Sequence, residues 1–320
     1  MQITYHNPVY SEYFADPFVL LVDGVYYAYG TGSGVLADGR AFPVLRSRDL
    51  VQWEALGGAL ELPGGAASSM CWAPEVVERD GQFFLFYSSA LGDEANHRLR
   101  VAVADNPAGP FHDTGGLLLP DEGFSIDAHP FHDPRDGRWY LFFAKDFFDE
   151  RVGTGIAVAP LADDMRSAAG PAATVVRASA DWQIYERERT HYGRQWDAWH
   201  TVEGPFVQFH EGRYYCFYSG GSWLTPQYGL SYAVADNVMG PYEDHWSAEG
   251  PAVLRGIPGE VIGPGHNSVV LGPDGRTPFV VYHAWDVAQT ARRMCIDPLL
   301  WTPDGPRCDG PSFEERTVML

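Results

Sequence analysis

The sequence predicts an all-β protein, built as one domain that forms a five-bladed β-propeller over residues 1–320. Aromatic residues make up 14% of the chain, a content well suited to pleated strands. The 24 prolines and 35 glycines interrupt the chain so often that no long stretch keeps the apolar spacing of a helix. A turn glycine followed by an alternating aromatic run recurs five times, at Gly24, Gly81, Gly137, Gly212 and Gly275.

Each of these glycines joins two short apolar runs. In the first repeat ADPFVLLVDG precedes GVYYAYG, and in the fourth VEGPFVQFHEG precedes GRYYCFYSG. Two such runs around a glycine turn predict a β-hairpin. The repeats recur at intervals of about 60 residues, which is typical of propeller blades, because a lone four-stranded sheet must stack on neighbours to bury both faces.

A third element follows in each unit. The segments AVADNPAGP (102–110) and AVADNVMGP (233–241) are nearly identical, and weaker versions lie at 44–54 and 156–165. The segment 181–200 lies in the longest gap between repeats and is the best candidate for a helix. Because long gaps between regular elements are often functional, we expect it to be an active-site loop rather than a blade strand.

Charge and composition exclude several classes of protein. Lys and Arg number 22 against 42 Asp and Glu, a net charge of -20 that repels nucleic acids and anionic membranes. The four cysteines are scattered without a CxxC pair, which argues against a metal cage or a disulfide scaffold. Neither a basic start with an apolar run nor a stretch of membrane-spanning length is present. We therefore expect a cytoplasmic protein, or a secreted one if a signal peptide had been trimmed from this chain.

The residues that open the repeats are unusual for apolar strands. The first strand of every blade lines the central channel of a propeller, so these residues should converge at one mouth. They include Asp16, Glu75, Asp127, Glu203 and His266. Carboxylates are seldom buried unless they are paired or used chemically, and their recurrence predicts acid–base catalysis by Asp16, Asp127 and Glu203.

Each acid also has a structural interpretation. Asp16 could cap the turn before Pro17, and Glu203 could be a solvated strand end. Asp127 lies between the apolar residues Ile126 and Ala128, which weakens a solvated interpretation. None of these interpretations explains why acids recur at corresponding positions of different repeats.

Four further residues form the predicted substrate-binding set. Trp72 and Trp223 could be core residues, but an indole face is also a platform for the C–H surface of a sugar. Glu75 follows the presumed pocket wall at Trp72 and is expected to act structurally there. Arg292 precedes an apolar strand and, if it reaches the mouth, could hold the acid or a substrate hydroxyl. His266 would face the axis, where a neutral imidazole could hold a metal ion or water or orient a carboxylate.

Five short motifs in this order resemble glycoside hydrolase family 43, the five-bladed propeller glycosidases that act on arabinose- and xylose-containing polysaccharides. They are Ala15-Asp16-Pro17, Trp72-Ala73-Pro74-Glu75, Ser125-Ile126-Asp127, Glu203-Gly204-Pro205 and Gly263-Pro264-Gly265-His266. The resemblance implies that Asp16 is the general base, that Glu203 is the general acid, and that Asp127 orients the acid and tunes its pKa. It also implies a Ca²⁺ ion or water near His266, and no organic cofactor. His129, which follows in Ala128-His129-Pro130, has no role in this scheme.

The chemistry is consistent with the resemblance. Inverting hydrolysis needs an acid and a base about 6.5 to 9.5 Å apart, a separation that carboxylates on different blades can reach. A charged Asp127 in a poorly solvated pocket would raise the pKa of Glu203, while Asp16 stays ionised. The leading hypothesis is an inverting, exo-acting α-L-arabinofuranosidase on imported arabinan or arabinoxylan oligosaccharides. A β-xylosidase, an endo-arabinanase and a non-catalytic glycan-binding propeller are the alternatives.

Overall fold

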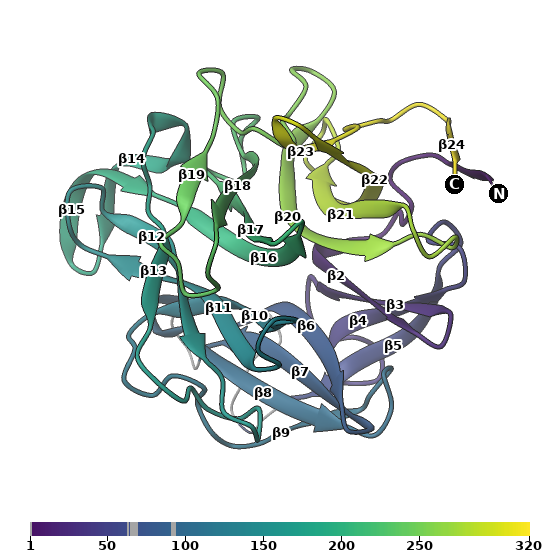
Figure 1. Ribbon diagram of the computed structural model, residues 1–320, viewed down its shortest axis with the longest axis horizontal. Helices are drawn as coiled ribbons and strands as arrows, with labels where there is room; N and C mark the ends of the chain where they lie inside the picture. Colours follow the sequence, from purple (N-terminus) through teal and green to yellow (C-terminus); the bar gives the residue numbers. More distant parts are fainter. Residues whose placement is uncertain (1, 63, 65–69, 91–93) are drawn as a thin grey trace.

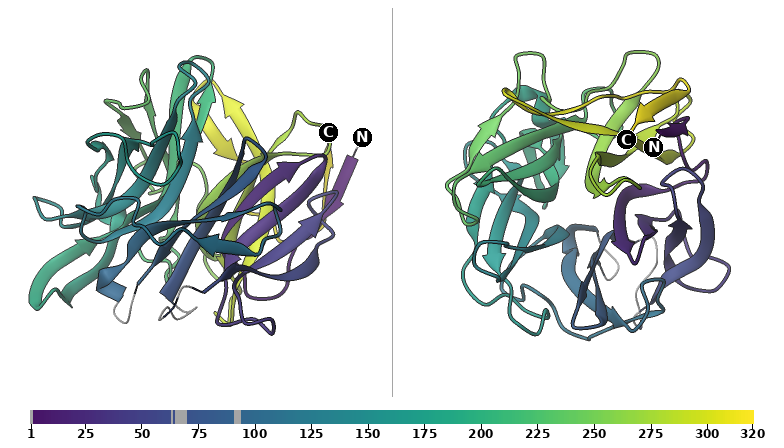
Figure 2. Two further views of the ribbon diagram at one scale, coloured as in Figure 1. Left: turned by 90° about the horizontal axis from the view of Figure 1, so that it is seen from below. Right: turned by 45° about the vertical axis from the view of Figure 1, so that its right-hand side comes forward.

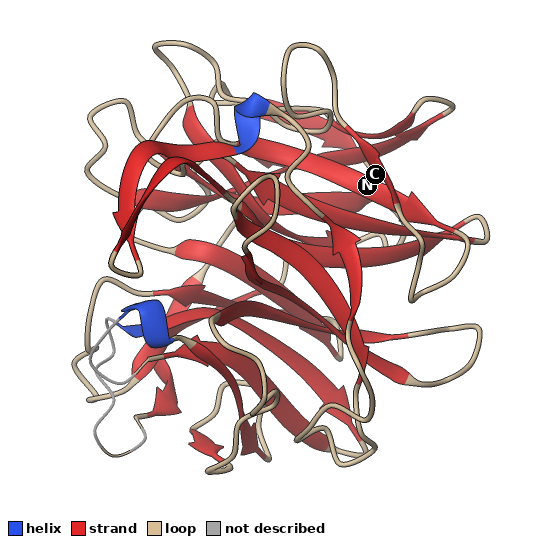
Figure 3. Cartoon of the chain, turned by 90° about the vertical axis from the view of Figure 1, so that its left-hand side faces the viewer, coloured by secondary structure: helices blue, strands red, loops and turns tan. Residues whose placement is uncertain are grey.

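The computed structural model describes residues 2–62, 64, 70–90 and 94–320. These residues form antiparallel strands almost throughout, with two short 3₁₀ turns, η2 (Glu94–Asn96) and η3 (Asp181–Gln183) (Figure 3). Within the described ranges, no helix has the length and apolar character needed to cross a membrane.

Five blades of four antiparallel strands each surround a common axis, which confirms the predicted propeller (Figures 1 and 2). A short parallel pairing of the outermost strands of blades 1 and 2 joins these two blades into one eight-stranded sheet. Blade 1 comprises β2 (Ala15–Val22), β3 (Val25–Thr31), β4 (Ala41–Ser47) and β5 (Glu54–Glu61). Blade 2 comprises β6 (Cys71–Arg79), β7 (Gln82–Ser89), β8 (Arg98–Ala104) and β9 (Phe111–Asp113). Blade 3 comprises β10 (Ser125–His132), β11 (Trp139–Phe147), β12 (Gly153–Pro160) and β13 (Ala173–Val176). Blade 4 comprises β16 (Val202–His210), β17 (Arg213–Gly220), β18 (Gly229–Ala235) and β19 (Glu243–His245). Blade 5 comprises β20 (Ile262–Leu271), β21 (Pro278–Trp285), β22 (Arg292–Thr302) and β23 (Gly305–Cys308).

The predicted hairpins are the two inner strands of each blade. All five turn glycines have positive φ, and in the first repeat Asp23 precedes Gly24 in the same region (φ 48° and 75°). Positive φ at both central residues matches the right-handed twist of the flanking strands. The third predicted element is also a strand, although β8 and β18 begin before their AVAD motifs and end within them.

The segment 181–200, expected to be an active-site loop and the best candidate for a helix, contains no α-helix. After η3 the chain forms a hairpin of β14 (Ile184–His191) and β15 (Arg194–His200). The turn at Tyr192 and Gly193 has positive φ at both residues (53° and 67°), which closes a two-residue hairpin. β15 pairs with β12 through Gly153 and His200, so the hairpin extends blade 3 as an appendage.

The ring closes where its ends meet. β1 (Gln2–Tyr5) pairs with β24 (Arg316–Met319), and the two termini lie together (Figure 1). The Asn7 amide also exchanges two hydrogen bonds with the backbone of Ile296 in blade 5. The apolar core lies between the faces of adjacent blades, where residues such as Phe42 and Tyr87 meet edge to face at 5.7 Å.

A bulge recurs at one position of all five inner strands. The residues at this position, each with φ between 48° and 58°, are Asp16, Ala73, Asp127, Gly204 and His266. A bulge re-aims the backbone, and in four cases its N–H donates to a side chain on the second strand of the preceding blade. These four interblade bonds are Ala73 to Thr31 Oγ1 (2.8 Å), Asp127 to Ser88 Oγ (2.9 Å), His266 to Ser219 Oγ (2.8 Å) and Asp16 to His283 Nδ1 (3.1 Å). The bulges thus fix Asp16, Asp127 and His266 at one level around the axis.

Candidate active site

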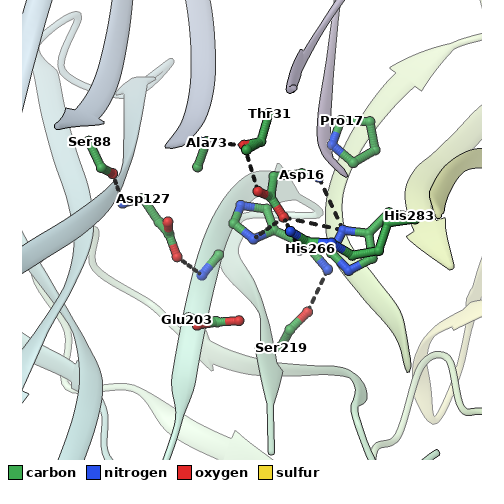
Figure 4. A network of polar contacts seen from close by, with 12 residues as sticks. Asp16, Pro17, Thr31, Ala73, Ser88, Asp127, Glu203, Ser219, His266 and His283 are labelled. Atoms are coloured by element: carbon green, nitrogen blue, oxygen red, sulfur yellow. Dashed lines mark hydrogen bonds and ion pairs between the residues drawn. The ribbon is translucent and has the colours of Figure 1, made fainter. Parts of the chain in front are cut away.

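A cavity of about 510 Å³ opens at this level of the propeller. All five blades contribute to its lining, and Asp16, Asp127 and Glu203 face one another within it (Figure 4). The lining also includes Trp72, Trp223, His266 and Arg292. The structure therefore brings together every predicted site residue except Glu75.

Asp16 is held by four side chains from two blades, those of Thr31, Arg292, His266 and His283. Its Oδ2 accepts the Thr31 hydroxyl at 2.6 Å, and its Oδ1 accepts Arg292 Nη1 at 3.2 Å. His266 Nδ1 lies 3.4 Å from Oδ1. Burial favours the neutral acid, but Arg292, His266 and His283 together outweigh this effect and hold the pKa of Asp16 well below its usual range. Asp16 is therefore a carboxylate near neutral pH.

Asp127 makes the fifth interblade bond in a different way from the other four. The side chain that would accept the Gly204 N–H is at position 144, which pairs with Ile126 as Thr31 pairs with Ala15, but residue 144 is an alanine. Instead, Asp127 Oδ2 accepts the Gly204 N–H at 2.9 Å. Burial and the charge of Glu203 raise the pKa of Asp127 well above its usual range.

Glu203 immediately precedes Gly204 on β16. Its Oε1 accepts the Tyr228 hydroxyl at 2.8 Å. Burial, reinforced by the charge of Asp16, raises the pKa of Glu203 to about 7 although the Tyr228 hydrogen bond opposes the shift. The sequence predicted that Asp127 would raise the pKa of Glu203, whereas burial is the largest cause of this increase.

Opposite pKa shifts equip the pocket for acid–base chemistry. Asp16 is ionised and can take a proton, while the buried Asp127–Glu203 pair retains one towards neutral pH. A general acid and a general base need different pKa values, and the different surroundings of these carboxyl groups provide that difference.

Arg292 and two tryptophans form walls of the same pocket. The Arg292 guanidinium lies 4.5 Å from the centre of the Trp223 ring, which itself stacks on Trp285. Trp72 stacks on His97 with ring centres 3.6 Å apart. Through its hydrogen bond to Oδ1, Arg292 contacts Asp16, the expected base, rather than the expected acid Glu203.

The predicted substrate-binding role of Glu75 needs correction, because Glu75 lies outside the described pocket lining. It is two residues beyond the bulge of β6, at the same level as His129 on β10, and the Nδ1 of His129 donates to its Oε2 at 2.7 Å. The Nε2 of His129 accepts the Val207 N–H at 3.0 Å, so its proton is on Nδ1. The His129 ring also packs on Phe206 at 4.7 Å. Glu75 and His129 therefore belong to a layer beneath the pocket, a structural role for both.

The sequence profile described as Glycosyl hydrolases family 43 matches residues 5–306. The chain belongs to glycoside hydrolase family 43. It is 29% identical to a β-D-galactofuranosidase of Aspergillus niger, with 93% of this chain and 83% of the relative covered. It is 26% identical to an extracellular exo-α-(1→5)-L-arabinofuranosidase of Streptomyces chartreusis, with 88% and 82% covered. The crystal structure of a thermostable family 43 glycoside hydrolase superposes with a TM-score of 0.84 at 32% identity, and 97% of each chain is covered.

The calcium ion that the family resemblance placed near His266 remains a prediction. Among the described residues, no group of three or more His, Cys, Asp or Glu side chains is arranged to hold a metal ion. Calcium takes about six to eight oxygen ligands, so the side chains around His266 do not by themselves fit this ion. The side chain of Asn267, next to His266 in the sequence, is buried, and its polar atoms have no hydrogen-bond partner among the described residues.

Sequence reasoning missed several groups that orient the acids of this family 43 site. Thr31 and His283 contact Asp16, and Tyr228 contacts Glu203. A signal for two of them was present, because Thr31, Ser88, Ser219 and His283 close the aromatic runs of their repeats. Aligning the ends of these runs would have revealed four polar residues and one exception, Ala144. Tyr228 lies in a loop outside the repeat and offered no such signal.

Proposed function

We propose that this family 43 enzyme is an inverting, exo-acting α-L-arabinofuranosidase that releases terminal arabinose from arabinan or arabinoxylan oligosaccharides. The observation that carries the proposal is that Asp16 and Glu203 face one pocket from blades 1 and 4 with oppositely shifted pKa values. Inversion requires such a pair, with a water molecule between the base and the sugar.

In this mechanism Asp16 takes a proton from the attacking water, whose oxygen bonds to the anomeric carbon. Glu203 gives its proton to the leaving oxygen as the glycosidic bond breaks. Asp127 fixes the backbone amide next to Glu203, while burial and the charge of Asp16 keep Glu203 protonated towards neutral pH. Thr31 and Arg292 hold the Asp16 carboxylate throughout.

The shape of the site supports an exo mode of action. Residues from all five blades line the cavity, among them Trp72, Trp223 and side chains of the β14–β15 hairpin. A pocket lined by every blade of the ring favours binding of the end of a sugar chain over its middle. An endo-arabinanase would instead need an open groove across the pocket.

Two relatives support a furanoside as the substrate, because one is named an arabinofuranosidase and the other a galactofuranosidase. β-D-Galactofuranose shares the five-membered ring and adds an exocyclic carbon. The higher identity to the Aspergillus niger enzyme makes a β-D-galactofuranosidase the second candidate.

A panel of nitrophenyl glycosides tests the proposal: α-L-arabinofuranoside, β-D-galactofuranoside and β-D-xylopyranoside. We expect the highest kcat/KM for the arabinofuranoside, single arabinose units from linear arabinan, and a first-formed product of inverted anomeric configuration by NMR. A higher kcat/KM for the xyloside or the galactofuranoside would show that arabinofuranose is not the preferred sugar. A product of retained configuration would contradict the roles of Asp16 and Glu203.

A further inference from the structure

One buried carboxylate oxygen in the pocket has no use in the mechanism above. Asp146 lies near the end of β11 and lines the cavity. Its Oδ2 accepts the hydroxyl of Tyr192, but its Oδ1 is buried and has no donor among the described residues. Leaving a buried acceptor without a hydrogen bond is costly, so this oxygen is available to a donor from outside the chain.

The surroundings of Asp146 suit a neutral, polyhydroxylated ligand. The β14–β15 hairpin brings Tyr185, Arg189 and Trp199 to the same part of the lining. The Arg189 guanidinium stacks over both rings, at 4.7 Å from Tyr185 and 5.4 Å from Trp199. Aromatic faces with a few charged hydrogen-bonding groups are the usual means of binding the C–H surfaces and hydroxyls of a sugar.

Asp146 is also linked, through Thr154, to the strand that carries the acid. Its cross-strand neighbour is Thr154, whose hydroxyl accepts the Val202 N–H at 3.1 Å, one residue before Glu203. The hairpin ends at His200, just before the same strand begins. Asp146 and the hairpin therefore lie on the Glu203 side of the pocket, whereas Asp16 enters from blade 1.

This placement identifies the part of the substrate concerned. In inverting hydrolysis the acid stands at the leaving oxygen, and the base with its water lies on the opposite face of the sugar. The leaving group must therefore extend towards the acid side. We propose that Asp146 and the β14–β15 hairpin bind the leaving-group sugar, and that Oδ1 of Asp146 accepts a hydrogen bond from a hydroxyl of that sugar. This proposal rests on the proposed function.

The ionisation of Asp146 is compatible with this role. Burial raises the pKa of Asp146 to about 6, against the Tyr192 hydrogen bond and the Arg189 charge. At neutral pH the group is thus mainly a carboxylate, a stronger acceptor for a hydroxyl than a neutral amide.

The test compares Asp146→Asn with wild type on two substrates that share a terminal sugar, whichever sugar wild type hydrolyses best. One is the nitrophenyl glycoside, whose leaving group has no sugar hydroxyl, and the other is the matching oligosaccharide. We expect the ratio of kcat/KM for the oligosaccharide to that for the nitrophenyl glycoside to fall by about 10- to 100-fold. Because the ratio is used, an error in the assigned terminal sugar leaves this test intact.

A matched control is Asp149→Asn, since Asp149 is exposed, pairs with Arg177 and lies outside the described lining. It should leave the ratio at its wild-type value. Tyr192→Phe keeps the Asp146 carboxylate but removes its donor on the hairpin, and it should lower the ratio by a few-fold. An unchanged ratio in both Asp146→Asn and Tyr192→Phe, with thermal unfolding as in wild type, would overturn the proposal.

Discussion

The carboxylate of Asp127 accepts the backbone N–H of Gly204 at 2.9 Å. At the other four bulges the acceptor lies on the second strand of the preceding blade, but here Ala144 has no group to offer. Asp127 fills that place and so becomes attached to the amide that follows Glu203. Asp127 and Glu203 are therefore coupled because blade 3 lacks the polar side chain that the other four blades have at this position.

Restoring the missing acceptor should disturb this link. In Ala144→Ser the new hydroxyl competes for the Gly204 N–H, a hydrogen bond that favours ionised Asp127. Without it the pKa of Asp127 rises further, so the acid pair keeps its proton to higher pH and the basic limb of the kcat/KM profile moves upward. We also expect kcat to fall by about 10-fold, because Glu203 is less well positioned.

The matched control is Ala102→Ser, a change at another fully buried strand alanine, in blade 2. Ala102→Ser should lower the free energy of unfolding by a similar amount but leave the pH profile of kcat/KM unchanged. Equal profiles for the two variants would show that Ala144 has no such influence.

Tyr228→Phe removes one hydroxyl and little else. The Tyr228 hydrogen bond lowers the pKa of Glu203, so its loss should move the basic limb from near pH 7 upward by about one pH unit. The pH dependence of kcat/KM measures this shift. Tyr232→Phe, whose hydroxyl binds the Asp304 carbonyl, should leave the limb unmoved; a shift of the same size there would contradict the assignment.

Arg292→Gln should affect the opposite limb. Arg292 holds the pKa of Asp16 low, so its removal raises that pKa, and the base becomes protonated as the pH falls through a higher value. Activity at acid pH should decline first, with KM also raised because the cation leaves the Trp223 wall. Arg293→Gln is the control, since the neighbouring Arg293 pairs with Asp286 away from the site. An unmoved acid limb in Arg292→Gln would refute the electrostatic role.

Gly204→Ala combines strain with a close contact. A Cβ at Gly204 would lie 3.1 Å from the His266 ring, at a φ of +58° that side chains rarely adopt. We expect a loss of about 2 to 3 kcal/mol in unfolding free energy and at least about 10-fold in kcat. Gly212→Ala has the same kind of backbone (φ +84°) in open space, so it should cost only about 1 kcal/mol with normal kcat. Equal effects on kcat would mean that the contact with His266 is unimportant.

The repeat made the fold predictable from the sequence, because turn glycines and alternating aromatic runs report the local hairpins directly. The register of the inner strands was enough to bring Asp16, Asp127 and His266 together. Glu75 was grouped with the pocket residues although it lies two residues beyond the position that Asp16 and Asp127 occupy in their repeats, a difference in register that the sequence alone did not show. The hairpin at 184–200 was expected to be an active-site loop rather than a pair of strands, because its charged, partly exposed strands lack the apolar alternation of the blades. Tyr228 depends on loop geometry, which no local pattern encodes.

The most direct test of the central claim compares Glu203→Gln and Asp16→Asn on glycosides of good and poor leaving groups. A dinitrophenyl glycoside needs little protonation, whereas an oligosaccharide needs the acid. We expect Glu203→Gln to lose roughly 10³-fold or more on the oligosaccharide but only about 10-fold on the dinitrophenyl glycoside, and Asp16→Asn to lose roughly 10³-fold or more on both. Equal losses by Glu203→Gln on the two substrates would contradict its role as the acid, and a near-normal rate in Asp16→Asn would contradict the whole account.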